Sequence, residues 1–78
     1  MTIMAGLAKN CAAVTPSDST RFGPSALFVG GAGTVVVEPE GAPGTTATFT
    51  VPAGGYVLLA CTAVKAASGA TLIMRLYD

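Results

Sequence analysis

The sequence predicts a small all-β protein: one antiparallel β-sandwich or barrel of about six short strands, preceded by an extended N-terminal arm. Apolar and polar residues alternate with a period of two, β-branched residues fill the apolar runs, and glycine and proline clusters separate these runs. No segment has a sustained helical period. Residues 62–70 come nearest, and Ser68-Gly69 would end such a helix early.

The length of 78 residues predicts a single domain. A chain of this size hides only about 60% of its unfolded surface, which makes a lone monomer marginally stable. Residues 12–78 are expected to form the β domain. Residues 1–11 have no clear periodicity and are expected to form the arm, either free or laid on a neighbour.

The expected strands differ in how completely they are covered. Residues 46–51 give the clearest alternation, with Ala47, Phe49 and Val51 on one face and three threonines on the other. In residues 34–38, Val35 and Val37 face away from their polar neighbours. Residues 25–29, 56–65 and 71–77 are denser apolar runs, which predict strands that are covered on both faces or that close a barrel.

Glycine and proline mark the turns between these strands. Gly30, Gly31 and Gly33 are expected to supply positive φ in a hairpin turn between residues 25–29 and 34–38. A phosphate-binding loop is disfavoured there, because the dinucleotide fingerprint requires a glycine where Val36 stands and a helix where a strand follows. Further turns are expected at residues 39–44, 52–55 and 68–69.

The composition predicts association with a partner. Hydrophobic residues make up 51% of the chain and charged residues only 10%, with a net charge of zero, and the mean hydropathy is +0.65. The charges are scattered, so neither nucleic acid nor an anionic membrane surface is an expected partner. The longest apolar run is shorter than the about 20 residues of a spanning helix. With few cysteines and no histidine to support disulfides or metals, oligomerisation is the remaining source of stability.

The polar cluster at residues 15–20 is expected to be turn chemistry and no active site. A serine nucleophile needs a base, and the chain has no histidine. A serine–lysine pair using Lys9 or Lys65 stays open from sequence. The favoured interpretation is that Pro16 fixes φ while Asp18 and the serines bond local backbone groups. No enzymatic activity is therefore expected.

Metal and cofactor sites are not expected. Two cysteines without histidine do not make a zinc site, and the acidic residues lack calcium-loop spacing. Glu38 and Glu40 flank Pro39 and are expected to keep a loop tip soluble. Cys11 and Cys61 are expected to be free, mostly buried thiols, and a single disulfide in an oxidising compartment is the alternative.

Most of the aromatic residues are embedded in expected strands, where core packing is the default. Phe22 is the exception, because it lies in an irregular segment between Arg21 and Gly23-Pro24. Two interpretations of Phe22 stay open: an anchor onto the protein's own core, or a protruding interface residue.

Four blocks of the chain resemble one known family. They are Thr15-Pro16-Ser17-Asp18-Ser19-Thr20, then residues 26–30 (ALFVG), then Phe49 followed by residues 51–54 (VPAG), and finally Leu76-Tyr77. In order and spacing they resemble the head spike base family of tailed phages and gene transfer agents. The resemblance covers about residues 12–78. The strand after VPAG carries only Lys65 where the family has several arginines, which favours a more hydrophobic contact.

The resemblance implies a structural virion protein on the capsid exterior, made in the host cytoplasm. It would be a homo-oligomeric capsid decoration or head spike base protein, with the major capsid protein and its own copies as partners and a head fibre protein as a further partner that it can seat. The candidate capsid or subunit interface consists of Thr15, Pro16, Ser17, Asp18, Ser19, Thr20, Arg21 and Phe22. The alternative function is a host-surface carbohydrate-binding or fibre-associated adhesion module.

Overall fold

The computed structural model describes residues 8–77 and confirms the all-β class with six antiparallel strands. No helix occurs within these residues. The strands are β1 (Asn10–Ala13), β2 (Ser25–Gly31), β3 (Gly33–Pro39), β4 (Ala47–Val51), β5 (Gly55–Val64) and β6 (Thr71–Tyr77).

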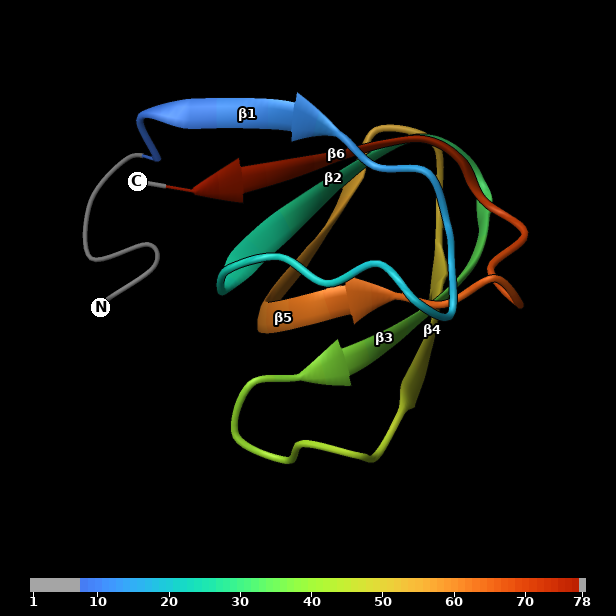
Figure 1. Ribbon diagram of the computed structural model, residues 1–78. Helices are drawn as coiled ribbons and strands as arrows, with labels where there is room; N and C mark the ends of the chain where they lie inside the picture. The colour runs from blue at the N-terminus through green and yellow to red at the C-terminus, as the bar shows by residue number, and fades with distance from the viewer. Residues whose placement is uncertain (1–7, 78) are drawn as a thin grey trace.

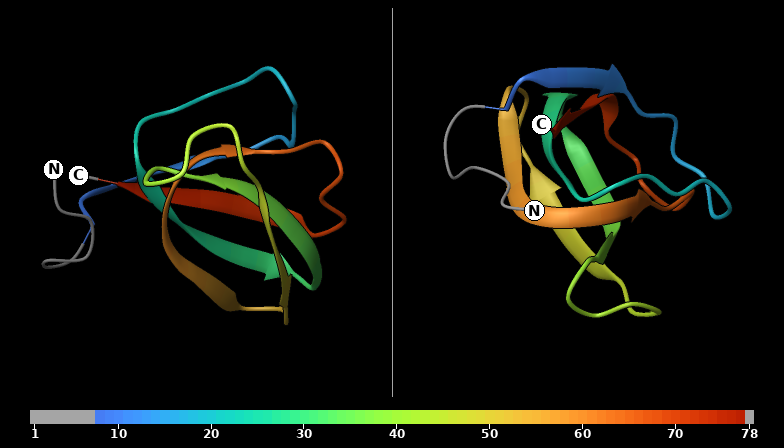
Figure 2. Two further views of the ribbon diagram at one scale, coloured as in Figure 1. Left: turned by 90° about the horizontal axis from the view of Figure 1, so that it is seen from below. Right: turned by 60° about the vertical axis from the view of Figure 1, so that its left-hand side comes forward.

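All six strands belong to one sheet with the order β1-β6-β2-β5-β3-β4 (Figure 1). Every ladder is antiparallel, and β3–β4 is the pair that is adjacent both in the chain and in the sheet. β1 and β4 form its two ends, and within residues 8–77 no ladder joins them. Both views of Figure 2 show the strands curving around a common interior.

Strand β5 creates much of this curvature because it bends sharply along its length (Figure 1). Its first half pairs with β2, with Val57 opposite Leu27, and its second half pairs with β3, with Val64 opposite Val37. The register shifts in both ladders, as expected where a strand bends and passes from one neighbour to the next. β2 and β3 thus lie on either side of one continuous strand.

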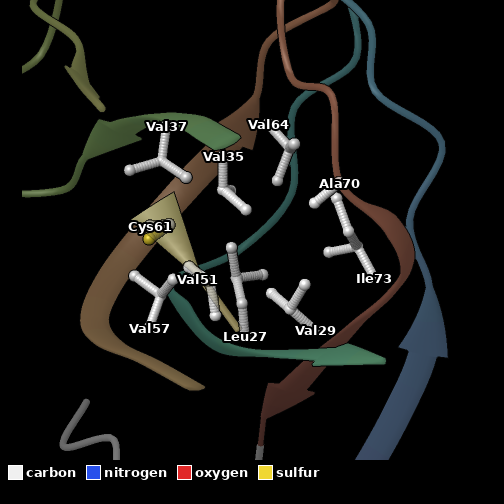
Figure 3. Packing of buried hydrophobic residues seen from close by; sticks show 10 residues of the cluster. All are labelled: Leu27, Val29, Val35, Val37, Val51, Val57, Cys61, Val64, Ala70 and Ile73. Atoms are coloured by element: carbon white, nitrogen blue, oxygen red, sulfur yellow. The ribbon is translucent and has the colours of Figure 1, made fainter. Parts of the chain in front are cut away.

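The core lies inside the curve of the sheet (Figure 3). Its side chains come from β2 to β6 and from the segment before β6, and they are small or β-branched apart from one leucine. The buried cluster consists of Leu27, Val29, Val35, Val37, Val51, Val57, Cys61, Val64, Ala70 and Ile73. Such residues suit a tight curve because they pack well on a pleated surface and leave room for the opposing strand.

The expected hairpin between residues 25–29 and 34–38 is wrong. Gly30 and Gly31 continue β2 without positive φ, and β2 and β3 are separated in the sheet by β5. The chain instead turns a corner at Ala32 and Gly33, where Gly33 has φ of +153°. A Cβ at Gly33 would lie 2.8 Å from the backbone of Ala70, so this glycine also permits close approach of the segment before β6.

The expected boundary of the arm also shifts. Asn10 and Cys11 belong to β1 and pair with Tyr77 and Leu76 of β6, so the sheet begins before Ala12. Residues 10–13 show no alternation of their own, so their strand conformation depends on the hydrogen bonding to β6. Residues 1–7 of the expected arm lie outside the described residues.

Candidate functional site

The segment between β1 and β2 contains all eight candidate interface residues and runs along β5 (Figure 1). The Ser17 amide donates to the Val64 carbonyl at 2.9 Å, and the Phe22 amide donates to the Thr62 carbonyl at 2.9 Å. The second half of β5 therefore has β3 on one side and this segment on the other. We call residues 14–24 the β5 flanking segment.

The polar cluster of this segment forms the expected turn, with one difference. Ser17 Oγ accepts from the Ser19 amide at 3.2 Å, a local bond of the type expected. Asp18 Oδ1 instead accepts from the amide of Ala66, 48 residues away, at 3.1 Å. Thr15, Ser19 and Thr20 are exposed. The cluster thus pins the segment to the loop after β5 while leaving several hydroxyls on the surface.

Arg21 and Glu38 form the strongest polar link of the flanking segment. Arg21 Nη1 and Nη2 donate to the two carboxylate oxygens of Glu38 at 2.8 and 2.7 Å. Lys65 Nζ lies 3.4 Å from Glu38 Oε1, and the Gly44 amide donates to Oε2 at 3.2 Å. One carboxylate on β3 therefore contacts the flanking segment through Arg21, the β3–β4 loop through Gly44 and the start of the loop after β5 through Lys65.

The expectation that Glu38 keeps a loop tip soluble is wrong, because its side chain is only 2% exposed. Hydrogen bonds from Arg21 and from the Gly44 amide, with the nearby charges, lower the pKa of Glu38 from 4.5 to about 2, against the opposing effect of burial. Arg21 remains 59% exposed. Glu40 is exposed, as expected for a residue of the loop tip.

Phe22 is an anchor on the protein's own core and not a protruding residue. It is partly buried and packs against the core cluster. The guanidinium of Arg75 lies 5.2 Å from the Phe22 ring centre and 3.9 Å from that of Tyr77, while Arg75 Nη1 donates to Ser25 Oγ at 3.2 Å. A cavity of about 320 Å³ adjoins Phe22 and Arg75, with Val14, Thr20 and Arg21 also in its wall.

A second feature lies on the side of the sheet turned away from the core. In β2, β5 and β6 the core takes Leu27, Val29, Val57 and Ile73, so alternate residues point outward. The ladders place Phe28 opposite both Met74 and Tyr56, and Cys11 opposite Leu76. The resulting apolar outer face consists of Cys11, Ala13, Phe28, Tyr56, Leu58, Leu72, Met74 and Leu76.

The apolar outer face is open to solvent at several large side chains. Leu72 is 75% exposed, Leu58 72% and Tyr56 57%, and the Tyr56 ring meets Phe28 edge-on with 5.3 Å between ring centres. At one end a groove of about 660 Å³ lies between β1, β5 and β6, lined by Ala8, Lys9, Asn10, Cys11, Tyr56, Leu58 and Leu76. Contiguous exposed apolar patches of this kind mark interaction sites.

The two cysteines are free, so the disulfide alternative is wrong. Cys61 is buried in the core as expected, and burial raises the pKa of its thiol to about 11. Cys11 is exposed, contrary to the expectation of burial, because β1 is an end strand and this residue faces outward.

Ser17 and Lys65, which the serine–lysine alternative would pair, each contact other groups in the structure. The hydroxyl of Ser17 bonds within its own turn, and Lys65 pairs with Glu38. Over the same range, no group of three cysteine, aspartate or glutamate side chains could hold a metal ion. Nor does any helix there have the length and apolar character needed to cross a membrane.

No family model matches the chain, and no curated protein matches it. Fold and site together define a small all-β domain with two contrasting surfaces, a pinned polar segment and an apolar outer face.

Sequence reasoning located the polar segment but missed both the Glu38 cluster and the outer face. The structure brings Ser17, Asp18, Arg21 and Phe22 against the protein's own body and leaves Thr15, Ser19 and Thr20 exposed. The dense apolar runs at residues 56–65 and 71–77 were the signal for the outer face. Either coverage on both faces or closure into a barrel was expected for these runs, and in the structure one face is open.

Proposed function

We propose that this chain is a structural virion protein of the outer capsid surface, a homo-oligomeric decoration or head spike base protein that binds capsomers and can seat a fibre. The observation that supports this proposal most strongly is the apolar outer face, on which Leu58 and Leu72 are more than two thirds exposed in a chain of 78 residues. A surface of this kind suits a protein that neighbours cover in an assembly. The four sequence blocks that resemble the spike base family supply the capsid context.

In this proposal the β5 flanking segment makes the capsid contact. Its backbone is held by Ser17 and Phe22 on β5, by Asp18 on Ala66, and by Arg21 on Glu38. Little ordering entropy remains to be lost when such a segment binds. The exposed hydroxyls of Thr15, Ser19 and Thr20 then provide hydrogen bonds to a polar capsid surface, and the protein is located on the virion exterior after synthesis in the host cytoplasm.

One observation favours the adhesion module as a second candidate. Tyr56 is an exposed aromatic ring, the kind of group on which a sugar can stack. Two other rings of the chain, Phe22 and Tyr77, are not free for such stacking, because they already pack against the Arg75 guanidinium. Tyr56 and the partly buried Phe28 are the aromatic rings of a mostly aliphatic outer face, which is a weaker basis for sugar recognition than that face is for assembly.

Co-sedimentation with capsids assembled without this protein tests the proposal. We expect the wild-type chain to co-sediment and Thr20→Lys to lose at least about tenfold in affinity, since a bulky charge would occupy the contact. Thr48→Lys is the matched control, because Thr48 is also an exposed threonine but lies on β4. Absence of capsid binding, together with binding to host cells or glycans, would replace the proposal by the adhesion module.

A further inference from the structure

Leu72 projects from the apolar outer face in a conformation that leucine disfavours. Its φ is +53°, in the left-handed region, and its side chain is 75% exposed. Gly30 makes room for it, since a Cβ at Gly30 would lie 2.9 Å from the Leu72 Cβ. Residues held in such conformations gather at binding surfaces, where the surrounding structure fixes them.

The groove on the same face lies at the opposite end of β6. Leu76 lines it, with Cys11 of β1 and Leu58 of β5. Met74 lies midway between Leu72 and Leu76, about 7 Å along the strand from each. The projecting Leu72 side chain and the groove therefore lie on the same face, at similar distances on either side of Met74.

A two-fold rotation near Met74 makes this surface complementary to itself. Turned face to face with a second copy, Leu72 of each molecule meets the groove of the other, the relation that an isologous interface requires. We propose that the apolar outer face is covered by a second copy of this chain, with Leu72 seated in the partner's groove. This inference rests on the homo-oligomer of the proposed function and names its surface.

The absence of charge and the extent of the outer face both suit pairing with a second copy. The eight residues of the outer face carry no charge, and Lys9 at the groove edge is the one charged residue among those lining it. Two identical faces therefore meet without repulsion, whereas a charged partner would gain nothing there. A standard interface buries about 800 Å² per partner. That is roughly a fifth of the 4247 Å² surface, and the face extends over four of the six strands.

Sedimentation equilibrium of the purified chain without capsids tests the pairing. We expect a dimer whose dissociation constant rises about 100-fold or more in Leu72→Asn, because each dimer loses two buried leucines. Asparagine tolerates positive φ, so this variant should fold. Thr48→Asn on β4 is the matched control and should leave the dimer intact. A monomer at all concentrations, a ring of odd number, or a dimer insensitive to Leu72→Asn would overturn the proposal.

A short bis-maleimide reagent tests the register. In Leu72→Cys, the new thiol and Cys11 of the partner should be joined, giving a covalent dimer. Adding Cys11→Ser should abolish that dimer, and Thr48→Cys should give none. Crosslinking that persists without Cys11 would overturn this register.

The sedimentation and crosslinking tests of the dimer do not depend on whether the protein binds capsids. A dimer that ignores capsids would contradict the proposed function and leave this pairing intact. A monomer that binds capsids, with Leu58 and Leu72 amides protected from hydrogen exchange only on the particle, would assign the face to the capsid and overturn the second copy.

Discussion

Arg21 and Glu38 form a bidentate ion pair, with two hydrogen bonds of 2.8 and 2.7 Å, that links the β5 flanking segment to the end of β3. The acid is buried and the base is exposed. Arginine suits this position because its planar guanidinium matches both carboxylate oxygens at once. The pair fixes the candidate capsid contact to the sheet.

Glu38→Gln should lower the free energy of unfolding at neutral pH. It should also make that free energy vary less with pH in the acid range. The pKa of Glu38 is lowered on folding from 4.5 to about 2, so its stabilising contribution is full above pH 4.5 and is lost as the pH falls towards 2. Urea unfolding followed by circular dichroism between pH 2 and 7 measures this slope. Glu40→Gln, an exposed glutamate two residues away, should keep the wild-type slope. An equally steep slope in Glu38→Gln would show that the pair does not couple protons to folding.

Gly30→Ala should destabilise the protein by about 1–3 kcal/mol, because the new Cβ overlaps Leu72. Gly41→Ala is the matched control: a Cβ there meets nothing within 4 Å, and the change should stay within about 1 kcal/mol. In a double-mutant cycle, Leu72→Gly should relieve the cost of Gly30→Ala. Additive free energies of unfolding in that cycle would contradict the close approach of the two residues.

The two thiols should react in separate phases with a maleimide at pH 8. Cys11 is exposed on the single chain and should be modified at once in a sample diluted below the dissociation constant of the proposed dimer. Cys61 is buried, with its pKa raised to about 11, and should react only when the protein unfolds. Mass spectrometry of timed samples distinguishes the phases, and Cys11→Ser should remove the fast one. Rapid modification of both thiols in the native protein would be incompatible with the core position of Cys61.

Asp18→Ala should expose the Ala66 amide to faster hydrogen exchange and cost about 0.5–1.5 kcal/mol, because the acceptor of that amide is lost. Asp18→Asn retains an oxygen at the same position and should keep most of the protection. If both variants exchange at the wild-type rate, Asp18 does not hold the flanking segment to the loop after β5.

Strands β2 to β6 were predictable because each feature that marks them is local, whereas β1 has no alternation of its own and was expected to lie partly in the arm. Alternation at residues 46–51 and the dense run at 71–77 correspond to β4 and β6 within one residue at either end. Strand order was not predictable in the same way. The glycines at residues 30–33 have the composition of a hairpin turn, yet β5 inserts between β2 and β3, and the sequence pattern does not record which strand pairs with which.

The parts of the site that sequence reasoning missed depend on distant partners. Glu38 is buried by Arg21 and Lys65, 17 and 27 residues away, so its local pattern resembled that of a solvent-exposed residue. Asp18 likewise accepts a hydrogen bond from the amide of Ala66, 48 residues away, a partner that no local pattern indicates. Ser17, whose partner Ser19 is two residues on, behaved as predicted.

Electron cryomicroscopy of capsids before and after addition of this protein tests the central claim most directly. The account predicts ordered density on the outer surface at capsomer centres or vertices, with the β5 flanking segment against the capsid. Capsids that look the same before and after addition, at protein concentrations well above those of the capsid subunits, would contradict it.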